Sequence, residues 1–241
     1  MAPVFELSGV KKRYGVLGPV DLRIDERETV ALIGPSGAGK STLLRMLNGL
    51  VAPDAGEVRF RGRPLPEDLA PLRRQIGYVI QGGGLFPHLD ARGNAALVAR
   101  WLGWDEPRIE ARIADLAALV RLPEDALARP PSRLSGGQAQ RVGLMRALML
   151  DPEVLLLDEP LGSLDPITRF DLQEDLRAAF ARLEKTVVLV THDLAEAAFF
   201  APRLVLLRDG RVVQSGSARE LCSAPAEAFV ERFVRAQRAA P

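Results

Sequence analysis

A glycine-rich segment at residues 34–42, Gly-Pro-Ser-Gly-Ala-Gly-Lys-Ser-Thr, constrains the fold of this chain more than any other feature. It fills every fixed position of the pattern G-x-x-x-x-G-K-[ST]. It lies between an apolar run at Thr29–Ile33 and a helical pattern that begins at Lys40. The glycines allow successive backbone N–H groups to point at a phosphate, and the positive end of the helix adds to their attraction. The segment therefore predicts a strand, a phosphate-binding loop and a helix, in that order.

The side chains of this loop predict how it holds a nucleotide and a metal ion. We expect Lys40 to bind the β- and γ-phosphates and the Ser41 hydroxyl to bind Mg²⁺. The other residues expected to contact the nucleotide are Gly34, Pro35, Ser36, Gly37, Ala38, Gly39 and Thr42. A glycine-rich turn with an incidental lysine is the alternative, but the complete motif in its strand-to-helix context argues against it.

A second apolar strand, expected at Val154–Leu157, is followed by two acidic residues. A Mg²⁺ ion held by one hydroxyl needs a carboxylate, so Asp158 is the predicted metal ligand. Glu159 is placed to accept a proton from a water that attacks the γ-phosphate, or to orient that water. The two acids could instead cap the following segment, an alternative that the phosphate loop upstream makes the minor one.

Short apolar runs alternate with helical patterns, which is typical of a mainly parallel sheet with crossover helices. The stretch from Pro87 to Pro131 departs from this alternation and is expected to be a helical insert, and the residues from Arg235 are expected to fray. The expected strands are Val4–Leu7, Val20–Ile24, Thr29–Ile33, Glu57–Phe60, Ile76–Ile80, Val154–Leu157, Thr186–Thr191 and the hairpin Leu204–Arg208 and Arg211–Gln214. The expected helices are Lys40–Gly49, Ala91–Trp101, Pro107–Leu122, Gly136–Leu150, Pro166–Leu183 and Leu194–Phe199.

Two of these helices carry apolar faces that predict their packing. In Pro107–Leu122 the face is Ile109, Ile113, Leu116 and Val120. In Pro166–Leu183, for which Asp165 is the expected N-cap, the face is Phe170, Leu176, Phe180 and Leu183.

Charge, cysteine content and hydropathy limit the partners of the chain. Its 32 basic and 31 acidic residues leave a net charge of +1, which disfavours nucleic acid as the main partner. Cys222 is the single cysteine and, with His88 and His192, leaves neither a disulfide framework nor a spaced zinc set, so a reducing cytosol is expected. No run approaches eighteen uncharged apolar residues, so a function at a membrane needs a partner that supplies the span.

A second group of motifs resembles a known family. Leu134-Ser135-Gly136-Gly137-Gln138, followed by a helix and then by the strand that ends in two acids, resembles the signature of the ATP-binding subunits of ABC transporters. The matching positions elsewhere are Gln81 for the Q-loop glutamine, Ser163-Leu164-Asp165 for the D-loop, His192 for the switch histidine, and Tyr14 for the aromatic ring that stacks on adenine. Ordered motifs over nearly the whole chain make this resemblance far more specific than any one of them.

The resemblance implies a fold and a domain organisation. It implies an α/β fold: a P-loop NTPase (RecA-like) core with a mainly parallel sheet, an N-terminal antiparallel β-subdomain and an inserted α-helical subdomain. Residues 1–241 would form a single ABC ATPase domain. Its helical subdomain would cover approximately residues 87–150, and a short hairpin and helix at 203–236 would close it.

The resemblance also implies the cofactors and the roles of the site residues. ATP and Mg²⁺ would be bound, with Lys40, Gln81, Glu159 and His192 catalytic and with Ser41, Gln81 and Asp158 holding the metal. Two copies would pack head to tail, so that Ser135, Gly136, Gly137, Gln138 and Asp165 contact the nucleotide held by the other copy. A helix N-terminus suits that anion, although a lone signature of this kind is more often a simple N-cap. A histidine after a strand is likewise more often structural.

Three segments look like those of ATPase subunits of osmoprotectant importers, for solutes such as glycine betaine, choline or related quaternary amines. They are 78–88, 165–169 and 185–193, although Gly82-Gly83 replaces bulkier residues that are usual in these subunits. This implies permease subunits as partners, an extracytoplasmic solute-binding protein as an indirect one, and a peripheral place on the cytoplasmic face of the inner membrane. Phe86, Leu89 and Trp101 would then contact the permease or, equally, pack within the insert.

Other functions stay open at this point. They are an ATPase that imports a different small solute such as an amino acid, an ABC ATPase of DNA repair or chromosome maintenance, and a regulatory module that binds ATP without useful turnover. The chain lacks the long coiled coils or zinc modules typical of the DNA-maintenance group. Intact Lys40, Asp158, Glu159 and His192 argue against the regulatory module.

Overall fold

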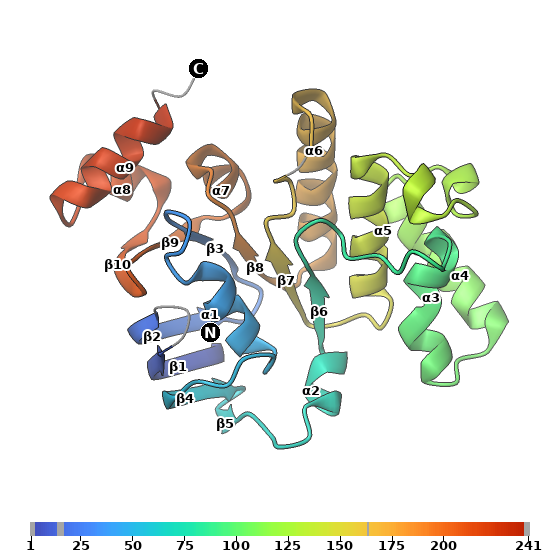
Figure 1. The fold of residues 1–241 in the computed structure, drawn as a ribbon, viewed down its shortest axis with the longest axis horizontal. Coiled ribbons are helices and arrows are strands. Elements are labelled where there is room, and N and C mark those ends of the chain that lie inside the picture. Colours follow the sequence, from blue (N-terminus) through green and yellow to red (C-terminus); the bar gives the residue numbers. More distant parts are fainter. Residues whose placement is uncertain (1–2, 14–16, 163, 239–241) are drawn as a thin grey trace. The chain divides into compact units, whose positions relative to one another are not determined.

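The computed structural model describes residues 3–13, 17–162 and 164–238 (Figure 1). Two expected site residues, Tyr14 and Ser163, lie outside these ranges. The chain forms two compact units. The first is Met1–Arg73 together with Thr186–Pro241, and the second is Arg74–Lys185.

The first unit contains an antiparallel sheet. Its strands are β1 (Pro3–Lys12), β2 (Leu17–Asp25), β4 (Ala55–Phe60) and the two-residue β5 (Arg63–Pro64), in the order β2-β1-β4-β5. In β2 the buried residues recur at every second position from Val20 to Ile24, which is the period of a strand with one face in the core. Phe5 and Phe60 meet across β1 and β4, with their ring centroids 5.2 Å apart. The expected antiparallel part near the N-terminus is confirmed.

The phosphate loop begins in a second group of strands of the same unit. β3 (Thr29–Ile33) pairs in parallel with both β8 (Thr186–Val190) and β9 (Arg203–Arg208), and β10 (Arg211–Gly216) pairs antiparallel to β9. Every residue of β8 is buried, as are the last four of β3. Strands covered on both faces give such continuous apolar runs. α1 (Lys40–Leu47) follows β3, and α7 (Leu194–Phe200) follows β8.

The end of the first unit corrects one expectation. After β10 the chain forms α8 (Ala218–Ser223) and α9 (Ala228–Arg238), so Arg235 and the three residues after it are helical and not a frayed tail. Val230 and Val234 are buried and hold α9 in place. The helix packs against α7 within this unit (Figure 1).

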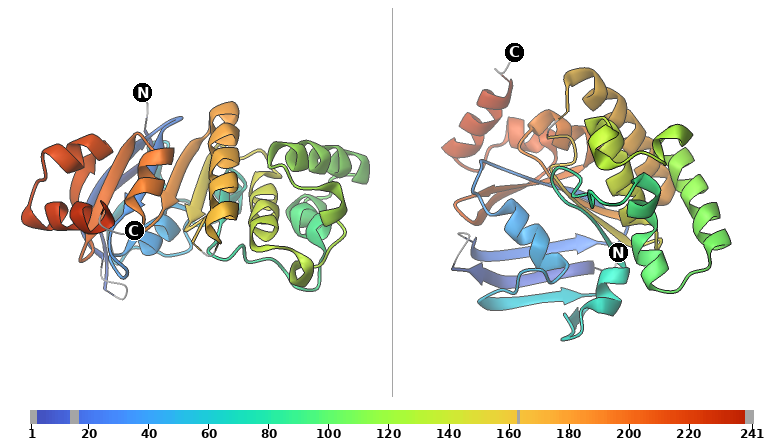
Figure 2. Two further views of the ribbon diagram at one scale, coloured as in Figure 1. Left: turned by 90° about the horizontal axis from the view of Figure 1, so that it is seen from above. Right: turned by 45° about the vertical axis from the view of Figure 1, so that its right-hand side comes forward.

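The second unit pairs two parallel strands, β6 (Ile76–Val79) and β7 (Val154–Asp158). Between them in sequence come α3 (Ala91–Trp101), α4 (Glu106–Leu119) and α5 (Gly136–Leu148), with short 3-10 turns η1 (Glu124–Ala126) and η2 (Pro131–Arg133). α6 (Pro166–Leu183) follows β7, and α2 (Ala70–Arg74) ends where this unit begins. The expected helical insert is therefore present, with α3, α4 and α5 packed against one another (Figure 2).

Burial on the two patterned helices agrees with one predicted face and corrects the other. Ile109, Ile113, Leu116 and Val120 are all buried, as expected. On α6 the buried face is Leu172, Leu176, Ala179 and Phe180, whereas Phe170 is 64% exposed. Two residues along a helix of 3.6 residues per turn place Phe170 on the opposite side from Leu172. The expectation for Phe170 was therefore wrong.

A buried ion pair joins α6 to its neighbours in the second unit. Asp175 is buried, and its Oδ2 lies 2.7 Å from Nη2 of Arg141 on α5. Its Oδ1 lies 2.6 Å from Nη1 of Arg121, just after α4. One carboxylate thus connects three helical segments of this unit.

Candidate nucleotide-binding site

The loop between β3 and α1 wraps around the ammonium group of its own lysine. Gly34, Gly37 and Gly39 have φ angles of +141°, +78° and +95°, in the range that favours glycine. Lys40 is only 6% exposed, and its Nζ donates to the carbonyl oxygens of Gly34 at 2.8 Å and Pro35 at 2.9 Å. A buried positive charge therefore lies inside a loop of backbone groups.

Two glycines of this loop are required for different reasons. A Cβ at Gly34 would lie 2.1 Å from the carbonyl oxygen of Leu207 on β9, so no side chain fits there. A Cβ at Gly37 would meet nothing within 4 Å. Gly34 is therefore needed for packing inside the unit, whereas Gly37 faces open space of the kind that a bound phosphate needs.

The start of α1 differs from the other helix starts. Its N-cap, Gly39, makes no side-chain capping bond, and its first turn holds no acidic residue. Among the α-helices whose N-cap the structure describes, the others are capped by a side chain: Asp90, Asp105, Ser135, Asp165, Asp193 and Ser217. A helix N-terminus without an oxygen from its own cap suits an external anion.

His192 follows the strand next to β3. Because Leu32 of β3 pairs in parallel with Val190 of β8, the phosphate loop and His192 leave the same edge of neighbouring strands. Thr191 donates from its buried hydroxyl to Glu196 at 2.9 Å, and Asp193 caps α7. The His192 side chain is exposed. The structure thus brings the expected histidine to the edge that carries the phosphate loop.

In the second unit, Gln81 contacts the expected catalytic glutamate. Gln81 Nε2 donates to Glu159 Oε2 at 2.9 Å. Asp158 is buried and accepts a hydrogen bond of 3.4 Å from the Tyr78 hydroxyl. β6 and β7 are parallel neighbours, with Val79 paired to Leu157, so the residues that follow them meet at one edge. The residue types were expected from the sequence, but this contact was not.

The backbone conformation after Gln81 explains the pair Gly82-Gly83, which stands where related subunits have bulkier residues. Gly82, Gly83 and Gly84 all have positive φ angles. Arg146 on α5 donates to the carbonyl oxygens of Gly83 and Gly84, each at 2.9 Å. Burial lowers the pKa of this guanidinium. Sequence reasoning missed Arg146, because nothing in its own neighbourhood marks it as a residue that holds this loop.

The signature segment closes its own helix end. Ser135 caps α5: its Oγ accepts from the backbone N–H of Gln138 at 3.2 Å, and its own N–H donates to Gln138 Oε1 at 3.0 Å. Gly136 and Gly137 allow the beginning of α6 to approach, since a Cβ at Gly137 would lie 2.5 Å from Thr168. This reciprocal arrangement is a capping box.

Asp165 lies at the start of α6, beside the signature. It caps α6 by accepting from the backbone N–H of Thr168 at 3.1 Å. Hydrogen bonds from the side chain and backbone of Thr168 lower the pKa of Asp165. Its expected capping role is confirmed.

The expected site residues are divided between the two units. Lys40, Ser41 and His192 belong to the first unit, whereas the second contains Gln81, Asp158, Glu159, the signature and Asp165. The expected metal set of Ser41, Gln81 and Asp158 includes one carboxylate. Among the described residues, no three His, Cys, Asp or Glu side chains gather into a metal-binding cluster.

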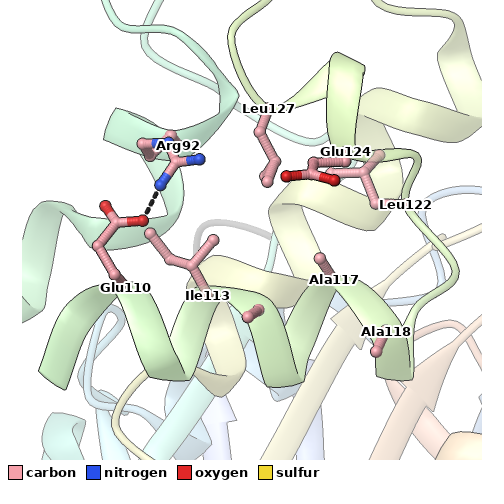
Figure 3. Close-up of a pocket in the computed structure, with 9 residues that line it drawn as sticks. Arg92, Glu110, Ile113, Ala117, Ala118, Leu122, Glu124 and Leu127 are labelled. Carbon is pink, nitrogen blue, oxygen red and sulfur yellow. Dashed lines mark hydrogen bonds and ion pairs between the residues drawn. The ribbon is translucent and has the colours of Figure 1, made fainter. Parts of the chain in front are cut away.

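A cavity of about 380 Å³ lies apart from these residues, within the helical part of the second unit. Figure 3 shows the ion pair of Arg92 and Glu110 at one side and Glu124 at the other, with Ile113 and Ala117 of α4 between them. None of the residues expected to bind nucleotide lines it. The cavity is therefore not part of the candidate site, which consists of the loops and helix ends described above.

Comparison with known proteins assigns the family. The family model described as ABC transporter matches residues 17–162, from β2 to the segment after β7. The chain belongs to the ABC transporter family. Within the described residues, no helix of this family member is long and apolar enough to cross a membrane.

Curated relatives of this ABC transporter chain have transport names. It is 45% identical to the glycine betaine/carnitine/choline transport ATP-binding protein OpuCA of Bacillus subtilis over 98% of its own length and 63% of that protein's. It is 46% identical to the glycine betaine uptake system ATP-binding protein YehX of Escherichia coli over 95% of its length and 76% of that protein's. The chain thus spans less than two thirds of the Bacillus subtilis relative.

Solved structures place the fold among ABC ATPase cassettes. The ATP-binding cassette MJ0796, in a dimeric post-hydrolysis state bound to ADP and Pi, is 34% identical, with a TM-score of 0.81 over 89% of this chain and 99% of that one. CbiO1 from Clostridium perfringens, part of the ABC transporter complex cbiONQ, is 26% identical, with a TM-score of 0.83 over 97% of this ABC chain and 93% of that one.

Proposed function

We propose that two copies of this chain bind two ATP molecules between them, hydrolyse them, and thereby drive the import of a small solute through permease subunits. The observation that carries the proposal is the loop at residues 34–42. It holds a buried ammonium group and opens an α-helix that has no side-chain cap. This combination of charge, backbone wrap and helix end is the chemistry that binds a polyphosphate.

The residues of the chain fit ATP and Mg²⁺. Lys40 would exchange its two carbonyl partners for the β- and γ-phosphates, and Gly37 leaves space beside the loop. Ser41, Gln81 and Asp158 would hold Mg²⁺, which prefers oxygen ligands and supplies charge neutralisation at the phosphates. The nucleotide contacts extend through Pro35, Ser36, Ala38 and Thr42, and Tyr14 would stack on the adenine.

Glu159 is the proposed general base for hydrolysis. Its carboxylate would accept a proton from the water that attacks the γ-phosphate. The hydrogen bond from Gln81 supports this role, because the amide orients the carboxylate of Glu159. His192 would contact the γ-phosphate and the water, and it leaves the same strand edge as the loop that contains Lys40.

The second copy completes each site in this proposal. Ser135, Gly136, Gly137, Gln138 and Asp165 would face the γ-phosphate held by the partner copy. A relative solved as a dimer with ADP and Pi supports the arrangement. We take residues 1–241 as a single ABC ATPase domain, with a helical subdomain over about 87–150 and a closing hairpin and helix at 203–236.

The proposed solute is an osmoprotectant such as a quaternary amine. The names of the glycine betaine, carnitine and choline relatives support it. The permease subunits would be direct partners, with exposed Phe86 and Trp101 as candidate contacts, and a solute-binding protein would act indirectly. Net charge and family disfavour nucleic acid as a partner. The chain would lie at the cytoplasmic face of the inner membrane.

A different solute is the second candidate, and one observation favours it. The chain is 45% identical to the Fe(3+) ions import ATP-binding protein FbpC of Streptomyces coelicolor, over 96% of its own length and 67% of that protein's. Identity at this level therefore does not separate the two solutes. Uptake assays decide between them: the chain is combined in vesicles with the permease and binding protein of an osmoprotectant importer or of an iron importer, and labelled glycine betaine or Fe³⁺ is supplied.

The ATPase proposal is tested with Glu159→Gln, which keeps the shape of the side chain and removes its basicity. We expect a loss of turnover of about 100-fold or more, with ATP still bound and ATP-dependent dimers accumulating. The matched control is Glu67→Gln, at an exposed position outside the site. Unchanged hydrolysis in Glu159→Gln removes this residue as the base. The proposed function is contradicted if the wild type does not hydrolyse ATP and the Glu159→Gln variant does not form ATP-dependent dimers.

A further inference from the structure

One face of α9 ends in a polar side chain that reaches residues 191–194, between the end of β8 and the start of α7, which we call the switch segment. Val230 and Val234 are 0% and 5% exposed, and Gln237 follows at the next position of the same helix face. Helix residues at i, i+4 and i+7 share a face, so an apolar residue would be expected at position 237. An amide there needs partners, and it finds them around His192.

Gln237 bridges two backbone groups on either side of Asp193. Its Nε2 donates to the carbonyl oxygen of His192 at 3.0 Å, and its Oε1 accepts from the N–H of Leu194 at 3.4 Å. The first of these bonds joins residues 45 positions apart in sequence. Both ends lie in the first unit.

The local structure explains why this bridge is needed. β8 ends at Val190, and Asp193 caps α7 by accepting from the N–H groups of Ala195 and Glu196. That cap does not include the N–H of Leu194. A side-chain amide supplies both a donor and an acceptor, so it can pair with the His192 carbonyl and the Leu194 N–H together.

We propose that Gln237 is a positioning residue for His192, in the sense that it holds the backbone from which the imidazole projects. The inference rests on the proposed function, in which His192 contacts the γ-phosphate and the attacking water. Without the amide, the segment between β8 and α7 gains freedom and the imidazole spends less time in its working position. Misplacement of a catalytic group lowers the rate much more than it lowers binding.

The chain contains a matched control for this bridge. Gln214 on β10 makes the same arrangement elsewhere: its Nε2 donates to the carbonyl of Ala224 at 3.0 Å, and its Oε1 accepts from the N–H of Ala226 at 2.8 Å. It holds the connection between α8 and α9 and has no bond to the switch segment. Replacing either glutamine by methionine removes an amide bridge while keeping similar side-chain length.

The experiment compares chains of residues 1–241 that carry Gln237→Met or Gln214→Met. Both are expected to lower the melting temperature slightly. Only Gln237→Met is expected to lower kcat for ATP, by about tenfold, with KM within about twofold of the wild type. Equal kcat in the two variants overturns the inference, as does a loss in Gln237→Met that appears in KM alone.

A double-mutant cycle with His192→Ala tests whether the effect passes through the histidine. If it does, Gln237→Met lowers kcat in the wild type and has no further effect in His192→Ala. Losses that multiply independently overturn the positioning role. A wild type without turnover contradicts the proposed function instead. The inference is then judged by hydrogen exchange of the peptide over 191–197, which must accelerate in Gln237→Met and not in Gln214→Met.

Discussion

The starts of α1 and α5 are both proposed to face a phosphate, yet they are built in opposite ways. α1 begins at Gly39, which has no side chain to cap it, whereas α5 begins at Ser135, which closes a capping box with Gln138. The first helix end can accept an anion without losing an internal cap. At the second, a phosphate must compete with a cap worth about 1 kcal/mol.

This difference assigns the two helix ends separate contributions. The first residue of α1 is Lys40, so charge and helix end act together there. The segment before α5 offers a hydroxyl and backbone groups only. We therefore expect ATP affinity to depend mainly on α1, and ATP-dependent association of two copies to depend mainly on α5.

The largest expected effect comes from Lys40→Met. Removal of the buried charge should weaken ATP binding by about 30-fold or more, because loss of one partner of a buried charge pair costs about 2–5 kcal/mol. Titration with a fluorescent ATP analogue measures it. Lys185→Met is the control, since Lys185 forms an ion pair with Asp151 outside the site. If Ser135→Ala weakened ATP binding as much as Lys40→Met, ATP affinity would not depend mainly on the start of α1.

The two glycines of the α1 loop should separate folding from binding. Gly34→Ala forces a methyl group against the Leu207 carbonyl and should destabilise the fold by about 2–4 kcal/mol. Gly37→Ala meets no neighbour and should cost about 1 kcal/mol through its positive φ, with ATP affinity reduced about tenfold. Urea unfolding and ATP titration report the two quantities. A Gly37→Ala protein with wild-type ATP affinity would show that this side of the loop does not face the nucleotide.

Ser135→Ala sharpens the comparison from the side of α5. It removes one cap and should cost about 1 kcal/mol of stability, as should Ser217→Ala, which removes the equivalent cap of α8. In a Glu159→Gln background, only Ser135→Ala should weaken ATP-dependent dimerisation, by about tenfold, with ATP affinity of the single copy unchanged. Analytical ultracentrifugation with and without ATP measures this. Identical dimerisation in the two serine variants would leave Ser135 with a structural role only.

The smallest expected effect is a difference in how the stability contributed by the capping boxes of α5 and α8 depends on pH. Hydrogen bonds from the backbone and side chain of Ser217 lower the pKa of Glu220, whereas Gln138 in the α5 box does not titrate. A carboxyl with a lowered folded pKa stabilises the protein above its unfolded pKa, here about 4.5, and this stability is lost as the pH falls through the folded pKa.

Melting temperatures between about pH 6 and pH 4 test this difference. The wild type should lose slightly more stability over that range than Glu220→Gln, whose α8 box no longer titrates. Gln138→Glu, which makes the α5 box acidic, should lose more than the wild type. A Glu220→Gln protein with the wild-type pH profile would show that the α8 box contributes no titrating stability.

Local sequence was enough for the elements with strong signals at their ends. α3 and α6 have the expected bounds, and Asp165 is the N-cap of α6 as expected. The phosphate loop was equally accessible, because its residues are neighbours in the chain and one strand and one helix position them. The two-residue β5 and the five-residue α2 were missed because such short elements carry no usable periodicity.

Phe170 and Arg235 show why the other errors arose. The burial of Phe170 and the helical state of Arg235 both depend on which elements pack against the helix, and the apolar pattern of the sequence does not show which elements these are. Phe170 fits an apolar stripe in the sequence but points away from the buried face of α6. Arg235 belongs to a polar C-terminal stretch, yet Val230 and Val234 anchor the helix that contains it.

The sequence by itself determined which residue types form the proposed site: a glycine-rich loop with a lysine, two acids after a strand, a signature before a helix and a histidine after another strand. These motifs consist of particular residue types at short spacing, so they can be recognised from the linear sequence. Tertiary structure alone decided that Gln81 contacts Glu159 and that Arg146 binds the backbone of the glycines that follow Gln81. It also decided that Gln237 bridges the segment around His192. Each of these contacts joins residues at least 43 positions apart, and such pairs meet only when strands and helices pack.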